Sequence, residues 1–105
     1  MRKFMEFRRY ALVTGAASGM GRIYCKELAL KGYNVVLVDI NDAGLDETMR
    51  IVEDAVRTSA LVPELMKKDL KLIKVVQDLS AVDAADRIYE ITESAGCEVE
   101  VLVNN

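Results

Sequence analysis

The chain has 105 residues, of which 51% are hydrophobic and 30% are charged, so it is long enough for one globular domain with its own core. Its 14 basic and 17 acidic side chains give a formal charge of −3, which offers no electrostatic basis for binding nucleic acid or an anionic membrane. It has no histidine, and this excludes a Ser-His-Asp triad, a Cys-His pair and most zinc sites.

The N-terminal segment is basic, and we expect residues 1–9 to be a solvated tail before a single domain over residues 10–105. The charges of this tail come from four side chains, Arg2, Lys3, Arg8 and Arg9. The apolar run after it, 10–13, is too short for an export signal. No uninterrupted apolar stretch approaches the roughly 18 residues that a membrane span needs. Cys25 and Cys97 lie far apart, which predicts two buried thiols and a cytoplasmic protein.

Four short runs rich in β-branched residues are predicted to be strands, over residues 10–14, 34–39, 72–77 and 99–104. The stretch 35–38 is continuously apolar rather than alternating. A continuous apolar run is typical of strands that are covered on both faces, as in a parallel sheet.

Helical spacing of apolar residues fills the intervals between these runs. The first helix is predicted to bury one face and to end before Gly32, and its face consists of Met20, Ile23, Tyr24 and Leu28. The second has a regular apolar stripe, formed by Leu45, Met49, Val52 and Val56. Pro63 is predicted to open a short extra turn through residue 66, followed by surface residues 67–69.

The last helix is predicted over residues 81–95, with Ser80 as its N-cap, Asp83 at the capping-box position and Gly96 just past its end. Its apolar face would consist of Ala84, Ile88, Ile91 and Ala95. The resulting β-α-β-α-β-α-β order predicts an α/β fold with a parallel sheet, about half of a doubly wound fold. Ligands of such sheets bind at the carboxyl ends of the strands.

A glycine-rich turn joins the first strand to the first helix in the sequence TGAASGMG, residues 14–21. Glycine permits a tight turn and lets backbone N–H groups approach a phosphate, and the helix N-terminus adds partial positive charge. The spacing GxxxGxG therefore indicates an anion site, although a turn that serves packing alone has the same pattern.

Asp39 ends the second strand, 18 residues after Gly21. In a dinucleotide-binding fold an acid near this position accepts hydrogen bonds from the adenosine ribose hydroxyls. The alternative is a turn or cap residue before Asn41 and Asp42.

TGAASGMG after YALV, followed by VVLVD, QDLS and LVNN, resembles the N-terminal half of the short-chain dehydrogenase/reductase family, which has a Rossmann-like fold. The resemblance implies a cofactor turn formed by Gly15, Ser18, Gly19, Met20 and Gly21. It also implies that Asp39 holds the ribose, that Asp78 and Leu79 contact the adenine ring, and that Asn104 and Asn105 border the cofactor. Asp78 has a simpler alternative role as a turn residue beside Ser80.

The 105 residues depart from this family in one respect. Family members carry a catalytic serine and a Tyr-x-x-x-Lys pair, but the residues four positions after the four tyrosines are Thr14, Leu28, Leu37 and Glu93. We therefore expect a dinucleotide-binding domain truncated before the catalytic half, with no catalytic residue, no metal site and no activity of its own. The parent would be an NAD(P)-dependent oxidoreductase that acts on a small alcohol or ketone, and the alternative is a non-catalytic NAD(P)-binding or regulatory module.

NAD is the expected cofactor, because the 2′-phosphate of NADP would lie against the carboxylate of Asp39. Arg22 is the only nearby cation, on the first helix, and the sequence leaves the direction of its side chain open. We also expect the isolated chain to self-associate, because the strand at 99–104 forms an apolar sheet edge.

Overall fold

The computed structural model describes residues 9–105. Residues 1–8, which hold Arg2, Lys3 and Arg8 of the predicted tail, lie outside the described residues. Arg9 belongs to the first strand, and its Nε donates to Glu100 Oε1 at 2.9 Å. The tail prediction is therefore wrong for Arg9, because an ion pair with the neighbouring strand holds it in the sheet.

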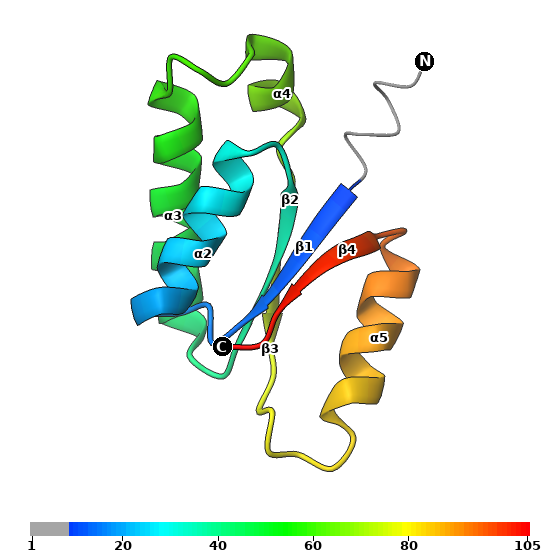
Figure 1. Ribbon diagram of the computed structural model, residues 1–105. Coiled ribbons are helices and arrows are strands. Elements are labelled where there is room, and N and C mark those ends of the chain that lie inside the picture. Colours follow the sequence, from blue (N-terminus) through cyan, green and yellow to red (C-terminus); the bar gives the residue numbers. More distant parts are fainter. Residues whose placement is uncertain (1–8) are drawn as a thin grey trace.

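Four parallel strands form one sheet in the order β3-β2-β1-β4 (Figure 1). The strands are β1 (Arg9–Thr14), β2 (Asn34–Asp39), β3 (Leu72–Val76) and β4 (Glu98–Val103). The helices are α2 (Gly19–Leu30), α3 (Asp42–Thr58), α4 (Glu64–Asp69) and α5 (Ala84–Ser94). This topology confirms the predicted α/β fold with a parallel, Rossmann-like sheet, and places the short helix α4 where Pro63 predicted an extra turn.

Two helix layers enclose the sheet, with α2 and α3 on one face and α5 on the other (Figure 1). The strands β1 and β2 are buried almost throughout, as the continuous apolar run predicted. The outer strands β3 and β4 are only partly covered, because they form the two edges of the sheet. Within residues 9–105, every helix is too short or too polar to traverse a lipid bilayer.

The buried face of α2 differs from the prediction. Its buried residues are Gly21, Cys25 and Ala29, whereas the side chains of Met20, Ile23 and Tyr24 are exposed. Small residues allow the helix axis to lie close to the sheet, and this close approach turns the larger side chains outward. Leu28, the fourth residue of the predicted face, packs against the edge of the core.

The stripe predicted for α3 is confirmed, because Leu45, Val52 and Val56 are buried and Met49 packs against them. The last helix starts later than predicted, at Ala84, with Asp83 as its N-cap. Ser80 is therefore not the cap: its hydroxyl donates to Asp78 Oδ1 at 2.7 Å, in a separate turn that precedes the helix. On α5 the buried positions are Ala84 and Thr92, while Ile88 is partly buried and Ile91 and Ala95 are exposed.

Candidate functional site

A pocket of about 170 Å³ lies at the carboxyl ends of the strands, where the predicted site residues meet. Its lining combines five of those predicted residues with Ile40 and Gln77; the five are Gly15, Asp39, Asp78, Leu79 and Asn105. They come from four separate segments of the chain, and the parallel topology brings the strand ends to one edge of the sheet. The C-terminus lies at this edge (Figure 1).

The glycine turn beside this pocket favours glycine at three positions. Gly15 has φ +64°, and a Cβ atom there would lie 2.8 Å from Asn105 Nδ2. A Cβ atom at Gly21 would collide with the carbonyl oxygen of Gly15, so the first turn of α2 packs directly on the end of β1. Close approach thus explains the first and last glycines of the GxxxGxG spacing, and the middle one, Gly19, is explained by its φ of +58°.

The remaining residues of the predicted cofactor turn, Ser18, Gly19 and Met20, are exposed at the start of α2. Ser18 is the N-cap residue, but its side chain makes no capping hydrogen bond. The first amide groups of a helix have no partner within the helix, and they carry partial positive charge. An exposed helix start of this kind can receive an anionic group such as a pyrophosphate.

The carboxylate of Asp39 connects the end of β2 to the glycine turn. Its Oδ2 accepts from the backbone N–H of Ala17 at 3.0 Å, and its Oδ1 accepts from the N–H of Asn41 at 3.1 Å. A carboxylate oxygen has more than one acceptor direction, so both oxygens can also receive ribose hydroxyls. The structure shows the turn contact of Asp39 with Asn41, and it also places Asp39 in the lining of the pocket.

Asp78 and Leu79 follow β3 on the far side of the pocket. Asp78 Oδ1 accepts from the hydroxyl and from the backbone N–H of Ser80, at 2.7 and 2.9 Å. These hydrogen bonds from Ser80 lower the pKa of Asp78 below its ordinary value, so this residue is a carboxylate at neutral pH. Leu79 has 47% of its surface exposed and offers an apolar wall.

Asn104 and Asn105, the asparagine pair after β4, are hydrogen-bonded to the end of β1 and to the first residue of the glycine turn. The backbone N–H of Asn105 donates to Thr14 Oγ1 at 3.0 Å, and its side-chain amide donates to the carbonyl oxygen of Gly15 at 3.3 Å. The hydroxyl of Thr14 lies 3.2 Å from Asn104 Oδ1. The pair therefore holds the start of the glycine turn beside β4.

Two residues near the turn were missed as site residues by the sequence analysis. The guanidinium of Arg22 is directed at the carbonyl oxygens of Ala17 and Gly44, which settles the direction that the sequence left open. Thr48, on the side of α3 that faces the turn, is fully buried, and its hydroxyl donates to the carbonyl oxygen of Ala16. Its position in line with the apolar stripe, three residues after Leu45, is the only sequence signal that could have indicated this burial.

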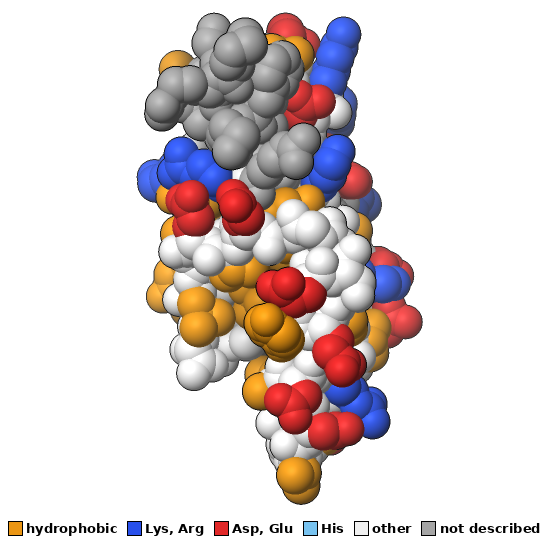
Figure 2. Space-filling model, turned by 90° about the vertical axis from the view of Figure 1, so that its right-hand side faces the viewer, with side chains coloured by type: hydrophobic (Ala, Val, Ile, Leu, Met, Phe, Trp, Pro, Cys, Tyr) orange, Lys and Arg blue, Asp and Glu red, His pale blue; other side chains and the backbone are white. Residues whose placement is uncertain are grey.

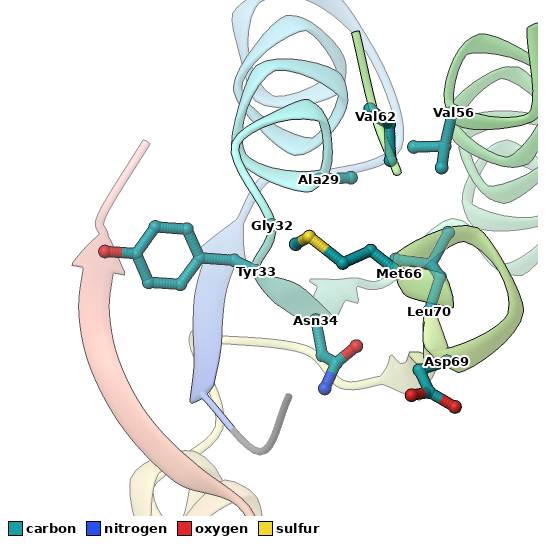
Figure 3. Close-up of a pocket in the computed structure, with 9 residues that line it drawn as sticks. All are labelled: Ala29, Gly32, Tyr33, Asn34, Val56, Val62, Met66, Asp69 and Leu70. Atoms are coloured by element: carbon teal, nitrogen blue, oxygen red, sulfur yellow. The ribbon is translucent and has the colours of Figure 1, made fainter. Parts of the chain in front are cut away.

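A second pocket lies at the opposite edge of the sheet, where β2 begins (Figure 3). Its free space is only about 10 Å³, which is room for no more than a single water molecule. Figure 3 shows the side chain of Met66 from α4 reaching toward Gly32, so a side chain of the protein itself fills this region. This pocket contains none of the predicted site residues.

Neither cysteines nor a metal cluster add to the candidate site. Cys25 is buried, as predicted, but Cys97 is only partly buried because β4 lies at the edge of the sheet, and both are free thiols. Burial raises the pKa of Cys25 to about 12, so its thiol stays protonated and unreactive at neutral pH. In the part of the chain that the structure describes, no three acidic or thiol side chains gather as metal ligands.

Comparisons with known proteins place this geometry in a family. The family model for short chain dehydrogenase matches residues 9–105. Curated relatives include very-long-chain 3-oxoacyl-CoA reductase-B of Danio rerio and 17-beta-hydroxysteroid dehydrogenase type 3 of Mus musculus, each 36% identical over 92% of this chain. The chain spans only 27% of the length of each of these two relatives.

Solved structures agree with this assignment. A metagenomic short-chain oxidoreductase in complex with NADP is 28% identical, with a TM-score of 0.71 over 92% of this chain and 38% of that chain. Acetoin dehydrogenase from Enterobacter cloacae is 25% identical, with a TM-score of 0.71 over 92% of this chain and 35% of that chain. The resemblance carried by the glycine turn, Asp39 and the terminal asparagines is confirmed, and the chain belongs to the short-chain dehydrogenase family.

Proposed function

We propose that the chain binds a nicotinamide dinucleotide and forms the cofactor-binding half of an oxidoreductase that transfers hydride between the cofactor and an alcohol or ketone. The observation that carries this proposal is the single pocket in which Gly15, Asp39 and Asp78 meet beside the exposed start of α2. The names of the curated relatives support the substrate class, because an oxoacyl group carries a ketone and a hydroxysteroid carries an alcohol.

The residues present fit such a cofactor. The backbone amides of the exposed residues 18–20 would hold the pyrophosphate, and Asp39 would accept from the adenosine ribose hydroxyls. The deprotonated carboxylate of Asp78 would accept from the adenine amino group, with Leu79 against the ring. Asn105 would border the cofactor through its hold on Gly15. When bound, the nicotinamide supplies the hydride chemistry, and this chain contributes binding and orientation.

NAD is proposed as the preferred cofactor, and Asp39→Ala tests the preference. Charge-assisted hydrogen bonds to the ribose hydroxyls of NAD are worth roughly 1.5–3 kcal/mol, whereas the 2′-phosphate of NADP would be repelled. The unchanged chain should therefore bind NAD at least about tenfold more tightly than NADP, and Asp39→Ala should remove that ratio. Calorimetric titration with both cofactors measures it directly.

A matched control for this test is Asp54→Ala, which removes an exposed carboxylate near the far end of α3. It should leave the NAD to NADP ratio unchanged. If the unchanged chain binds both cofactors equally, or if Asp39→Ala keeps the ratio, then Asp39 does not select the cofactor. If it binds neither dinucleotide, the proposed function of this chain is wrong.

We further propose that these 105 residues are inactive alone, because no tyrosine among them is followed four positions later by lysine. A phenol whose pKa is lowered by a nearby ammonium is the proton donor expected in this family. Incubating the chain with NAD and a series of secondary alcohols should produce no NADH absorbance. Turnover that persists after repurification would contradict this prediction.

A non-catalytic module that binds or senses NAD(P) is the second candidate function, because the pocket residues proposed to hold the dinucleotide would serve such a module equally well. The gene downstream of the codon for Asn105 distinguishes the two candidates. A continuing reading frame that encodes a Tyr-x-x-x-Lys pair supports the oxidoreductase, and a stop codon supports the module.

A further inference from the structure

Two polar side chains, Arg22 on α2 and Thr48 on α3, lie behind the glycine turn and away from the pocket lining. Thr48 is fully buried, and its hydroxyl donates to the carbonyl oxygen of Ala16 at 2.7 Å. The guanidinium of Arg22 donates through Nη2 to the carbonyl oxygens of Ala17 and Gly44, and through Nε to Thr48 Oγ1 at 2.9 Å. One guanidinium and one hydroxyl thus connect the turn, α2 and α3.

These contacts complete the hydrogen bonding of the turn backbone. The N–H of Ala16 donates to the carbonyl oxygen of Val38 at 3.1 Å, and the N–H of Ala17 donates to Asp39 Oδ2 at 3.0 Å. All four backbone polar groups of this alanine pair are therefore hydrogen-bonded. The two N–H groups donate to residues of β2, and the two carbonyl oxygens accept from Thr48 and Arg22. The pair is buried, so a lost partner would leave a polar group unsatisfied.

The start of α3 also presses directly on the turn. A Cβ atom at Gly44 would lie 2.8 Å from the Cβ of Ala17, so the two backbones approach as closely as glycine allows. The Gly44 N–H is in turn held by the N-cap residue Asn41, whose own N–H donates to Asp39 Oδ1. Asp39 is therefore fixed from two directions by segments that Arg22 and Thr48 hold together.

We propose that Arg22 and Thr48 are positioning residues that set the preference for NAD over NADP by holding Ala17 where its N–H orients the Asp39 carboxylate. This inference rests on the proposed dinucleotide binding. It assigns Arg22 a role opposite to that of a phosphate ligand, because its guanidinium is already engaged by three acceptors of the protein. Arg22, the cation nearest to the turn, thus supports Asp39, the acid proposed to select against the 2′-phosphate of NADP.

Four variants of the full chain separate the effect of the Arg22 charge from the effect of the hydrogen bonds that Arg22 and Thr48 make. Arg22→Lys keeps the charge but lacks the planar fork that reaches several acceptors, and Arg22→Gln removes both. Thr48→Val removes the hydroxyl while keeping the shape, and Thr48→Ser keeps the hydroxyl. Calorimetric titration with NAD and with NADP should show NAD binding weakened at least about tenfold by both Arg22 variants and by Thr48→Val, and NADP binding weakened less. Thr48→Ser should bind like the unchanged chain.

Arg57→Gln is the matched control, because Arg57 lies in the last turn of α3, in an exposed ion pair with Asp54. It should change neither affinity. Amide hydrogen exchange of Ala17 in the free protein gives a readout independent of the cofactor: Arg22→Gln and Thr48→Val should speed it at least about tenfold, and Arg57→Gln should not.

Three results would overturn the proposal. Loss of NADP binding alone in Arg22→Gln would make the guanidinium a phosphate ligand. Full NAD binding by Arg22→Lys would show that the positive charge matters rather than the planar guanidinium. Unchanged cofactor binding and unchanged amide exchange in Thr48→Val would show that Thr48 has no positioning role. If the unchanged chain binds neither dinucleotide, the proposed function fails and the selectivity role with it, whereas the exchange of Ala17 still reports whether the two side chains hold the turn.

Discussion

The two faces of the sheet are packed to very different degrees. The face under α2 and α3 carries the larger core, which extends from Val13 and Leu37 in the strands to Leu45 and Val52 in α3. The face under α5 has a smaller cluster of five buried strand residues, against which one side chain of the helix, the partly buried Ile88, packs. Hydrophobic stabilisation scales with buried apolar area, so the first face contributes most of the stability.

This difference coincides with the position of the candidate site. The glycine turn, with buried Ala16 and Ala17, is part of the larger core, so the turn proposed to hold the cofactor is built on the more extensively packed face. On the other side, α5 and β4 leave several apolar side chains exposed, namely Tyr89, Ile91, Val99 and Leu102. Figure 2 looks onto this side and shows hydrophobic side chains interspersed with acidic ones.

The largest expected effect is a difference in the free energy of unfolding between two leucine truncations, one at a buried position and one at an exposed position. Leu37 is fully buried under the α2 and α3 layer, so Leu37→Ala should lower the free energy of unfolding by about 2–5 kcal/mol. Leu102 has 67% of its surface exposed, so Leu102→Ala should cost less than about 0.5 kcal/mol. Urea denaturation of both variants measures the difference, and equal losses would mean that the two faces contribute equally.

A second pair of substitutions compares the glycines of the two regions. Gly21→Ala places a methyl group against the backbone of Gly15, which cannot move aside, and should cost at least about 3 kcal/mol. Gly96, after α5, has φ +73° and open space around it, so Gly96→Ala should cost only the backbone strain, about 1–2 kcal/mol. Thermal unfolding should rank them in this order; the reverse order would show that the turn can relax.

The smallest expected effect concerns self-association of the isolated chain, which we propose occurs at the β4 edge. An exposed apolar edge strand is a template for pairing with another chain, and a charge on it opposes pairing. Light scattering should show a mass above that of the monomer that grows with concentration, and Leu102→Lys should shift the association by about 1 kcal/mol toward monomer.

The control for this experiment is Ile23→Lys, since Ile23 is an exposed apolar residue on α2, away from the β4 edge. It should leave the association unchanged. A stable monomer at high concentration would contradict the proposal, and dissociation by Ile23→Lys instead would move the contact to α2.

The strands β1 and β2 and the stripe of α3 were predictable because each pattern has one physical cause. Residues 35–38 are continuously apolar since both faces of β2 are covered, and the stripe from Leu45 to Val56 repeats at helical spacing since one face is buried. The spacing of Gly15, Gly19 and Gly21 and the place of Asp39 at a strand end were also readable, because backbone approach and topology constrain them.

The rest depended on tertiary contacts that leave no periodic signal. The face of α2 was mispredicted because close approach to the sheet buries Gly21, Cys25 and Ala29, which a hydrophobicity pattern ranks below Met20 and Ile23. The start of α5 was misplaced because Ser80 has the chemistry of a cap but bonds to Asp78. The hold of Arg22 on the turn joins residues from three elements, so only the fold shows it.

The two outer strands of the sheet end it in different ways. On β3, Lys74 reaches across to α3 and pairs with both Asp42 and Asp46, at 2.6 and 2.8 Å. A lysine tied down along a short edge strand discourages further strand addition there. On β4, Glu98 and Glu100 are exposed in the first half of the strand, and Leu102 is exposed in the second half. The two outer edges of the sheet therefore carry charges of opposite sign, and the self-association that we propose at β4 would have to occur around Leu102, away from these carboxylates.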